Sequence, residues 1–261
     1  MKNLAQLILI FVIMITLINC SDSNKTKESS ELKSKIDQYA KTVLKYDENL
    51  LDDNQKIVVK KLYQAAKIMD DIFLDQVYSK NIELKKKLSA SDDSYDKLLL
   101  EYFNINFGPF DRLDHEKPFY DNSVKPSGAN FYPEDMAKEE FENFVKTHPD
   151  KEAEFTSEFT MIRRENDSLK AIPYTDYYKE QLSQISILMN EAAEYADNPS
   201  LKKYLVTRAL AFQTNDYYNS DMAWMDLKDH TIEVIIGPYE VYEDAMFNYK
   251  ASFECFLTLV D

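Results

Sequence analysis

The chain has 261 residues, of which 46 are acidic and 31 basic, so its formal net charge at pH 7 is −15. This charge argues against a nucleic-acid partner, because phosphates require a basic surface, and the 13% aromatic content excludes a disordered acidic chain. The three glycines are scattered along the chain, which disfavours a glycine-rich phosphate-binding loop.

The N-terminus has the pattern of an export signal. Lys2 precedes an apolar run that ends at Ile18, and Cys20 follows where the composition turns polar. This pattern predicts that residues 1–19 are a lipoprotein signal peptide and that Cys20 is the lipidation site, with residues 20–30 as a polar tether. We expect export and anchoring to a bacterial membrane, on its periplasmic or cell-surface side. An uncleaved anchor with an incidental cysteine is less favoured, because the apolar run is short.

Helices are predicted for the first part of the folded region. Apolar residues recur at helical spacing over residues 31–46 and again over residues 54–78. A shorter helix is predicted at residues 95–103. Residues 104–132 contain several prolines and glycines, which predict a long irregular segment.

The middle of the chain predicts further helices and one hairpin. Residues 133–147 open with Pro-Glu-Asp, which suits the first turn of a helix. Residues 159–163 and 169–174 flank a turn containing Asn and Asp, which predicts a β-hairpin. Helices are then expected over residues 176–196 and 199–212, separated by an Asp-Asn-Pro break.

The last part of the chain predicts strands. Residues 231–236 are rich in β-branched side chains, and residues 249–260 alternate with apolar side chains on both faces. A strand that is apolar on both faces is expected inside a sheet or beneath a second layer. Because the sequence stops directly after it, we expect either pairing with an earlier strand or an incomplete chain. The predicted fold class is α+β, helix-rich at first and followed by a mixed sheet.

One cluster of acidic and imidazole side chains could bind a divalent cation. It contains Asp111, Asp114, His115 and Glu116. Ion pairs with Arg112 and Lys117, together with capping of backbone groups, explain such clusters more often than a metal does. We therefore predict ion pairing, and no metal ligands are assigned.

The remaining reactive side chains do not form catalytic machinery. His148 precedes a proline and is expected at a helix end, while His230, beside two aspartates, could be an acid/base group but is favoured as part of a solvated loop. No serine lies in a nucleophile elbow, and Cys255 is expected to be a buried, inert thiol on a strand.

The richest segment in binding groups runs from Ile236 to Asp244. It contains two tyrosines and three acids directly after a predicted strand, at the kind of position where binding groups are often held. A phenol there could donate to a carbonyl group, and the carboxylates could hold an ammonium group. The alternative is an ordinary turn whose tyrosine rings pack on the core.

Four stretches carry a resemblance to a known family. They are Gly108–Leu113, Ser127–Pro133, Asp221–Asp226 and Ile235–Phe253. Together they resemble the N-terminal portion of bacterial relatives of dipeptidyl peptidase III, which are zinc-dependent exopeptidases with a cleft between two lobes. The resemblance covers most of residues 31–261 and implies one lobe of such an enzyme.

The resemblance also implies roles for residues of the last stretch. Tyr239 is expected to polarise the scissile carbonyl group. Gly237, Pro238 and Glu240 are expected to contact the peptide substrate. Gly237 stands where the dipeptide-releasing members carry an acid for the amino terminus of the substrate, which puts that specificity in question.

The family's zinc ligands, on a His-Glu-x-x-Gly-His helix and a second helix, are absent from this sequence. The expectation is therefore a peptidase region, residues 31–261, that is incomplete at its C-terminus and inactive alone. It would be a fragment, one half of an enzyme completed by a second chain that carries the zinc site, or a degenerate remnant. The alternative function is a non-enzymatic lipoprotein binding module for peptides or sugars.

Overall fold

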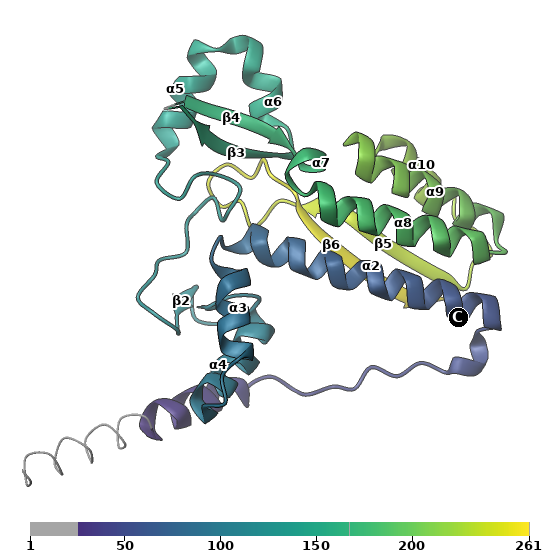
Figure 1. Cartoon of the computed structure of the whole chain (residues 1–261), viewed down its shortest axis with the longest axis horizontal. Helices are drawn as coiled ribbons and strands as arrows, with labels where there is room; N and C mark the ends of the chain where they lie inside the picture. The colour runs from purple at the N-terminus through teal and green to yellow at the C-terminus, as the bar shows by residue number, and fades with distance from the viewer. Residues whose placement is uncertain (1–25, 167, 261) are drawn as a thin grey trace, which may run out of the picture. The chain divides into compact units, whose positions relative to one another are not determined.

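The computed structural model describes residues 26–166 and 168–260, and they form two compact units (Figure 1). Of the described residues, the first unit contains 26–44 and Glu83–Ser123, and the second contains Lys45–Ile82 and those from Val124 onward. The predicted region 31–261 is therefore divided between them. The predicted signal peptide and Cys20 lie outside the described residues. Within the described ranges, no helix has both the length and the apolar character needed to cross a bilayer.

The first unit is built on helices and a minimal strand pair. Its elements are a helix over residues 26–36, most of α3 (Asn81–Ser89), α4 (Ser94–Asn106), β1 (Phe110–Asp111) and β2 (Lys117–Pro118). Leu32, Ile36, Leu99 and Phe103 are buried in it. The side chain of Asp93 accepts hydrogen bonds from the first backbone N–H groups of α4, which explains why this helix begins there.

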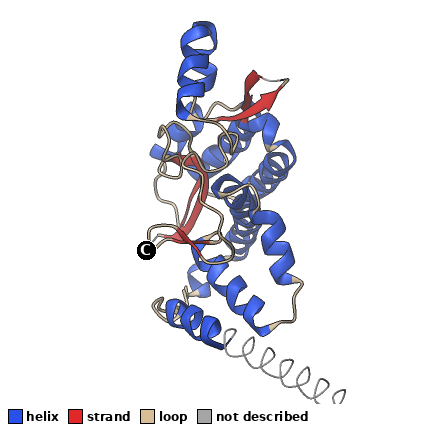
Figure 2. Ribbon diagram, turned by 90° about the vertical axis from the view of Figure 1, so that its left-hand side faces the viewer, coloured by secondary structure: helices blue, strands red, loops and turns tan. Residues whose placement is uncertain are grey.

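The second unit contains a helical layer on a two-stranded sheet, whose strands are red in Figure 2. Its helices are η1 (Glu48–Leu50), α2 (Asp53–Val77), α5 (Lys138–Thr147), η2 (Pro149–Lys151), α6 (Glu152–Thr156), α7 (Tyr174–Tyr177), α8 (Lys179–Tyr195), α9 (Pro199–Thr214) and α10 (Tyr218–Met225). Its strands are β3 (Thr160–Glu165), β4 (Ser168–Pro173), β5 (Ile232–Glu240) and β6 (Ser252–Leu259). Helix α2 lies along β6 and β5, α8 packs on α2 and α9, and α10 packs on α9 (Figure 1).

The sheet that carries the candidate site is an antiparallel pair of β5 and β6. Ile236 lies opposite Cys255 and Gly237 opposite Glu254. One face is buried through Val234, Ile236 and Phe253. This core is continuous with the buried faces of α2, α8 and α9, so the helices fix the position of β5.

Most predicted elements are confirmed, with shifted ends. The helix predicted over residues 54–78 is α2, the hairpin is β3–β4, and the last two predicted helices correspond to α8 and α9. The positive φ of Asn166, +49°, is the conformation that an Asn in a tight turn tolerates. The α+β class is confirmed.

Several expectations about element ends are wrong. The first helix ends at Ile36 rather than residue 46, and Leu44 beyond it is 92% exposed. Residues 26–30, which were expected to be tether, are helical. Helix α5 begins at Lys138 rather than residue 133, because a turn in which the N–H of Met136 donates to Pro133 precedes it.

The strand at the end of the chain also differs from expectation. The face of β6 that carries Phe253 is buried or half-buried along its length, whereas the other face is covered only at its start and Phe256 on it is 56% exposed. Among the described residues, β6 pairs with β5 and with no further strand. The apolar residues of its second face therefore lie at the surface and not inside a sheet.

Candidate functional site

The residues singled out in the sequence lie at the end of β5. Gly237 and Pro238 are buried, Tyr239 is half-buried and Glu240 is exposed. A register shift between Pro238 and Glu240 interrupts the ladder with β6 at Tyr239. Such bulges redirect side chains near sites. The four residues thus lie together, and their roles toward a substrate stay predictions.

The ring of Tyr239 belongs to a cluster around a buried arginine. The guanidinium carbon of Arg208, on α9, lies 5.5 Å from the ring centre of Tyr239, 5.6 Å from that of Tyr204 and 5.3 Å from that of Tyr217. Arg208 is fully buried, and its Nη2 binds the carboxylate of Asp221 on α10. These distances are typical of cation–π contacts.

The electrostatic environment keeps both groups in their ordinary protonation states. Burial raises the pKa of the Tyr239 phenol far above its usual range, Tyr204 adds to this, and the Arg208 cation counteracts it. Burial acts to lower the pKa of Arg208, but Tyr204, Tyr239 and Asp221 outweigh it and the net shift is upward. Tyr239 is therefore a neutral hydrogen-bond donor beside a permanent cation.

Gly237 is placed against this cluster. Its φ is +153°, a conformation that side-chain-bearing residues rarely adopt, and a Cβ atom there would lie 2.9 Å from Nη1 of Arg208. A glycine is needed at this position because the guanidinium occupies the space of a side chain.

Sequence reasoning assigned no role to Arg208 or to Glu254. Arg208 lies on the apolar stripe of α9, four residues after the buried Tyr204, and a charge on such a stripe is a readable signal. Glu254 is half-buried directly across the ladder from Gly237, and its pKa is raised by burial and by the nearby Glu240. In the sequence, the alternation of Phe253, Glu254 and Cys255 indicated only a strand. The pairing register of β5 and β6 was needed to place Glu254 opposite Gly237.

The loop between β5 and β6 is organised by Asp244, which is fully buried. Its carboxylate accepts a hydrogen bond from the hydroxyl of Tyr132 at 2.8 Å. It also accepts from the backbone N–H groups of Met246, Phe247, Tyr249 and Lys250. These hydrogen bonds hold the segment that follows Tyr239 in a turn that leads the chain back into β6.

A buried lysine anchors the other end of this loop. The amine of Lys250 donates to the carbonyl oxygens of Phe155 at 2.6 Å and Ser157 at 2.7 Å and to Oγ1 of Thr160 at 2.8 Å. Burial lowers its pKa to about 7, although Asp244 acts in the opposite direction. Lys250 thus ties the start of β6 to the segment between α6 and β3.

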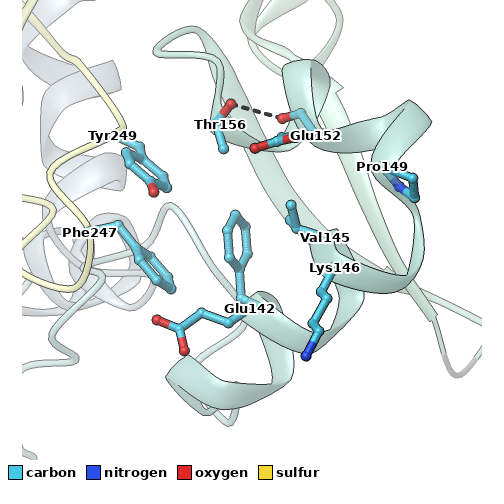
Figure 3. A pocket seen from close by; sticks show the side chains of 9 residues that line it. Glu142, Val145, Lys146, Pro149, Glu152, Thr156, Phe247 and Tyr249 are labelled. Carbon is cyan, nitrogen blue, oxygen red and sulfur yellow. Dashed lines mark hydrogen bonds between the residues drawn. The ribbon is translucent and has the colours of Figure 1, made fainter.

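A pocket of about 340 Å³ lies between this loop and helices α5 and α6 (Figure 3). Phe247 and Tyr249 project from the loop as a stacked pair, with ring centres 5.3 Å apart and planes 10° apart. Phe141 and Val145 of α5 add apolar surface, and Glu142 and Lys146 on the same helix are exposed. Such a pocket can take an apolar side chain beside a charged group.

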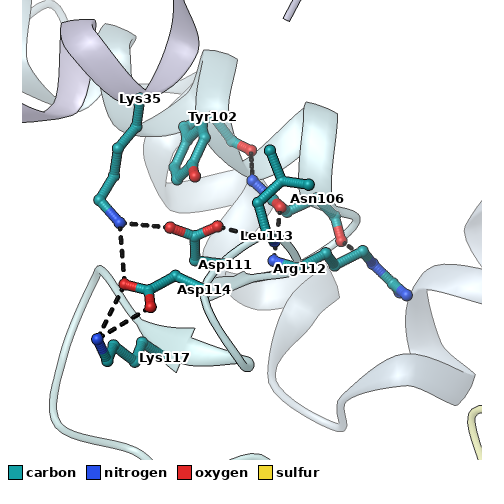
Figure 4. Close-up of polar contacts among 8 residues, drawn as sticks. All are labelled: Lys35, Tyr102, Asn106, Asp111, Arg112, Leu113, Asp114 and Lys117. Atoms are coloured by element: carbon teal, nitrogen blue, oxygen red, sulfur yellow. Dashed lines mark hydrogen bonds and ion pairs between the residues drawn. The ribbon is translucent and has the colours of Figure 1, made fainter. Parts of the chain in front are cut away.

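The acidic cluster before β2 forms ion pairs, as predicted (Figure 4). Lys35 binds Asp111 and lies 3.5 Å from Asp114, which also pairs with Lys117 at 2.9 Å. Burial acts to raise the pKa of Asp111, but the hydrogen bonds from Lys35 and Tyr102 and the charge of Lys35 together outweigh it, and the pKa is lowered. Pairing with Lys35 had not been foreseen, because it is distant in sequence.

The resemblance implies a catalytic zinc ion, which would need a group of ligand side chains. Within residues 26–166 and 168–260, no group of three or more His, Cys, Asp or Glu side chains is arranged to hold a metal ion. The described residues therefore do not fit a catalytic zinc, which needs three protein ligands.

His148, His230 and Cys255 lie in surroundings that suit a structural role. His148 ends α5, as predicted, with its ring stacked on Phe144 at 4.3 Å. His230 is more buried than the expected solvated loop, with its Nε2 3.9 Å from Glu233. Burial raises the pKa of the Cys255 thiol to about 12, which agrees with the expected inert thiol.

Comparison with known proteins assigns the family. The model of peptidase family M49 matches residues 124–261. The dipeptidyl peptidase III structure from Caldithrix abyssi is 65% identical, has a TM-score of 0.87 and covers 88% of this chain and 44% of its own. The dipeptidyl peptidase III structure from Corallococcus sp. strain EGB is 41% identical, with a TM-score of 0.86, and covers 89% of this chain and 44% of its own.

A curated relative from Arabidopsis thaliana, Nudix hydrolase 3, is 34% identical over 91% of this chain and 37% of its own length. The chain thus spans less than half the length of these relatives. The resemblance inferred from the four stretches is confirmed: the chain belongs to peptidase family M49, the zinc-dependent dipeptidyl peptidase III family.

Proposed function

We propose that this chain supplies one lobe of a peptidase of the dipeptidyl peptidase III type, with the end of β5 lining the substrate cleft. The observation that carries the proposal is Tyr239, a half-buried phenol at an interruption of the β5–β6 ladder. The reaction is hydrolysis of peptide bonds, as the family membership of residues 124–261 suggests.

In this proposal Tyr239 donates a hydrogen bond to the carbonyl oxygen of the scissile bond. A donor aimed at that oxygen stabilises the negative charge that develops on it in the transition state. The raised pKa of the phenol supports this role, because the hydroxyl keeps its proton at physiological pH.

Glu254 and Glu240 are proposed to receive the amino terminus of the peptide. Gly237 has no side chain to do so, and Glu254 lies directly across the ladder from it. The raised pKa of Glu254, caused by burial and then by Glu240, marks a carboxylate that a bound ammonium group would stabilise.

The zinc ion of the proposed enzyme is held by groups beyond the described residues, on a longer protein or on a second chain. A zinc ion held there would supply Lewis-acid polarisation of the carbonyl group and activation of water. Export and lipid attachment at Cys20 are part of the same proposal and rest on the sequence pattern of residues 1–20 alone.

A second candidate is a binding module that holds peptides without cleaving them. The pocket beside Phe247 and Tyr249 favours it, because stacked aromatic rings at a surface bind apolar ligand groups.

A chimeric enzyme tests the proposal. The matching part of the Caldithrix abyssi enzyme is replaced by this chain, and the zinc-dependent release of dipeptides from tetra-alanine is measured with and without a chelator. We expect Tyr239→Phe to lower kcat by about 100-fold, the usual effect of losing one oxyanion donor, with an unchanged melting temperature.

The matched control is Tyr218→Phe, which removes an exposed hydroxyl on α10 and should leave kcat unchanged. Equal turnover in the wild-type and Tyr239→Phe chimeras removes Tyr239 from the mechanism. A folded chimera that binds tetra-alanine but never cleaves it overturns the peptidase proposal and favours the binding module.

A further inference from the structure

The cation beside Tyr239 is unusual in its burial. The side chain of Arg208 has no exposed surface, although burying a charge is costly unless partners compensate. Among the residues that the structure describes, its one ion pair is with Asp221, whose own side chain is 46% exposed. The Nε and Nη1 atoms are buried and have no hydrogen-bond partner among the residues that the structure describes.

The compensation comes from aromatic rings. Tyr204 on the same helix, Tyr217 before α10 and Tyr239 on β5 lie within 5.6 Å of the guanidinium carbon. A desolvated guanidinium over aromatic faces is stabilised by electrostatic attraction to the rings. These contacts join α9 and the segment before α10 to the end of β5, so the position of Tyr239 is coupled to that of Arg208.

Gly237 completes the arrangement. Nη1 of Arg208 approaches β5 at Gly237, where a Cβ atom would lie 2.9 Å from that nitrogen. Because the neighbouring atom is charged, buried and anchored through Asp221, it has little freedom to withdraw. The glycine therefore permits the approach of the arginine to the strand.

We propose that Arg208 is the positioning residue of Tyr239: anchored by Asp221 and admitted by Gly237, its guanidinium holds the phenol ring in the orientation used toward substrate. This rests on the proposed function for the role of Tyr239, but the positioning itself is a property of the folded chain. Arg208 acts through Tyr239 and needs no contact with the peptide. Gly237 then serves the geometry of the site and not the binding of the substrate.

Fluorine NMR on this chain tests the positioning directly. With 3-fluorotyrosine incorporated at position 239, the ¹⁹F resonance reports the surroundings and motion of that ring. We expect Arg208→Met to shift and sharpen the resonance, because the ring loses its cationic neighbour and moves more freely. Arg208→Lys should restore part of the shift, since the charge returns without the planar group.

Two further variants separate positioning from general damage. In another arginine–tyrosine stack, the guanidinium carbon of Arg163 lies 4.6 Å from the ring centre of Tyr177. Arg163→Met removes that stack and should leave the resonance of Tyr239 unchanged. Gly237→Ala leaves the arginine in place but inserts the clashing Cβ, and should shift the resonance as Arg208→Met does. If neither Arg208→Met nor Gly237→Ala moves the resonance, the proposal is wrong.

The same variants in the chimera connect positioning to catalysis. Arg208→Met should lower kcat by about 30-fold, the rate equivalent of losing one desolvated cation–π contact at Tyr239, with little change in KM. An unchanged kcat with a shifted resonance would contradict the catalytic use of the positioning. A chimera without any activity refutes the proposed function instead, and the resonance still decides whether Arg208 positions Tyr239.

Discussion

Two buried cations in the second unit are stabilised in different ways. The compact ammonium group of Lys250 is surrounded by oxygen acceptors on three residues. The planar guanidinium of Arg208 meets tyrosine rings and a single carboxylate. Each partner set matches the shape of its cation. Lys250 therefore fixes a backbone segment, whereas Arg208 fixes a ring.

Replacing Lys250 with methionine tests its role as an anchor. We expect the free energy of unfolding to fall by about 3 kcal/mol, because buried acceptors at Phe155, Ser157 and Thr160 lose their donor. Urea denaturation measures the effect. The control Lys203→Met removes a lysine that is 61% exposed and should change stability by less than about 0.5 kcal/mol.

The same residue predicts a pH dependence. Because the pKa of Lys250 is about 7 in the folded chain and lower than its ordinary value of 10.5, the unfolded chain holds more protons between these values. Stability should therefore rise with pH from 7 to 10 in the wild type relative to the Lys250→Met variant. Parallel pH profiles of the two proteins would contradict the lowered pKa.

At the scale of elements, local signals explain where the long helices begin. The side chain of Asp52 accepts a hydrogen bond from the N–H of Gln55 at 2.8 Å, and its own N–H donates to the Gln55 side chain at 3.0 Å. This capping box starts α2, and Asn198 caps α9 in a similar way. These pairs lie within a few residues of each other, so the sequence alone indicates them.

The cap of α2 carries a stability prediction. Asp52→Ala should lower the free energy of unfolding by about 1 kcal/mol, because the backbone N–H of Gln55 loses its acceptor and the capping box is broken. The control is the neighbouring variant Asp53→Ala. The Asp53 side chain is fully exposed, and its ion pair with Lys56, at 3.7 Å, lies at the surface and contributes little to stability. Equal urea midpoints for the two variants would show that the capping box does not stabilise the helix.

Short elements, and ends that depend on distant contacts, were predicted poorly. The short helices α6 and α10 were not predicted, because they have too few turns for a periodic signal. Helix α5 starts late because Met136 is buried in the turn before it, which depends on the surrounding core. The apolar second face of β6 predicted burial, but no described element covers Phe256.

At the scale of the molecule, two compact units share a chain with a net charge of −15. The chain crosses between the units at Leu44, at Ile82 within α3 and at Ser123. The apolar spacing of the predicted helices gave no indication of this division, because it depends on which buried faces meet.

The net charge predicts the absence of one class of partner. A fluorescent DNA duplex titrated with the protein at about 50 mM salt should show no rise in anisotropy, because like charges repel at this ionic strength. A rise that disappears with added salt would reveal a basic surface and contradict the prediction. The same acidic surface is compatible with peptides that carry a free amino terminus.

The long helices, the hairpin, the α+β class and the family follow from the sequence alone, because their signals are local periodicity, caps and short motifs. The role of Tyr239 was likewise inferred from its motif. The tertiary structure was needed to bring Arg208 of α9 against Tyr239 and Gly237 of β5, and to pair Gly237 with Glu254. These contacts join residues 17 to 31 positions apart through packing and strand register, which no local pattern of side chains encodes.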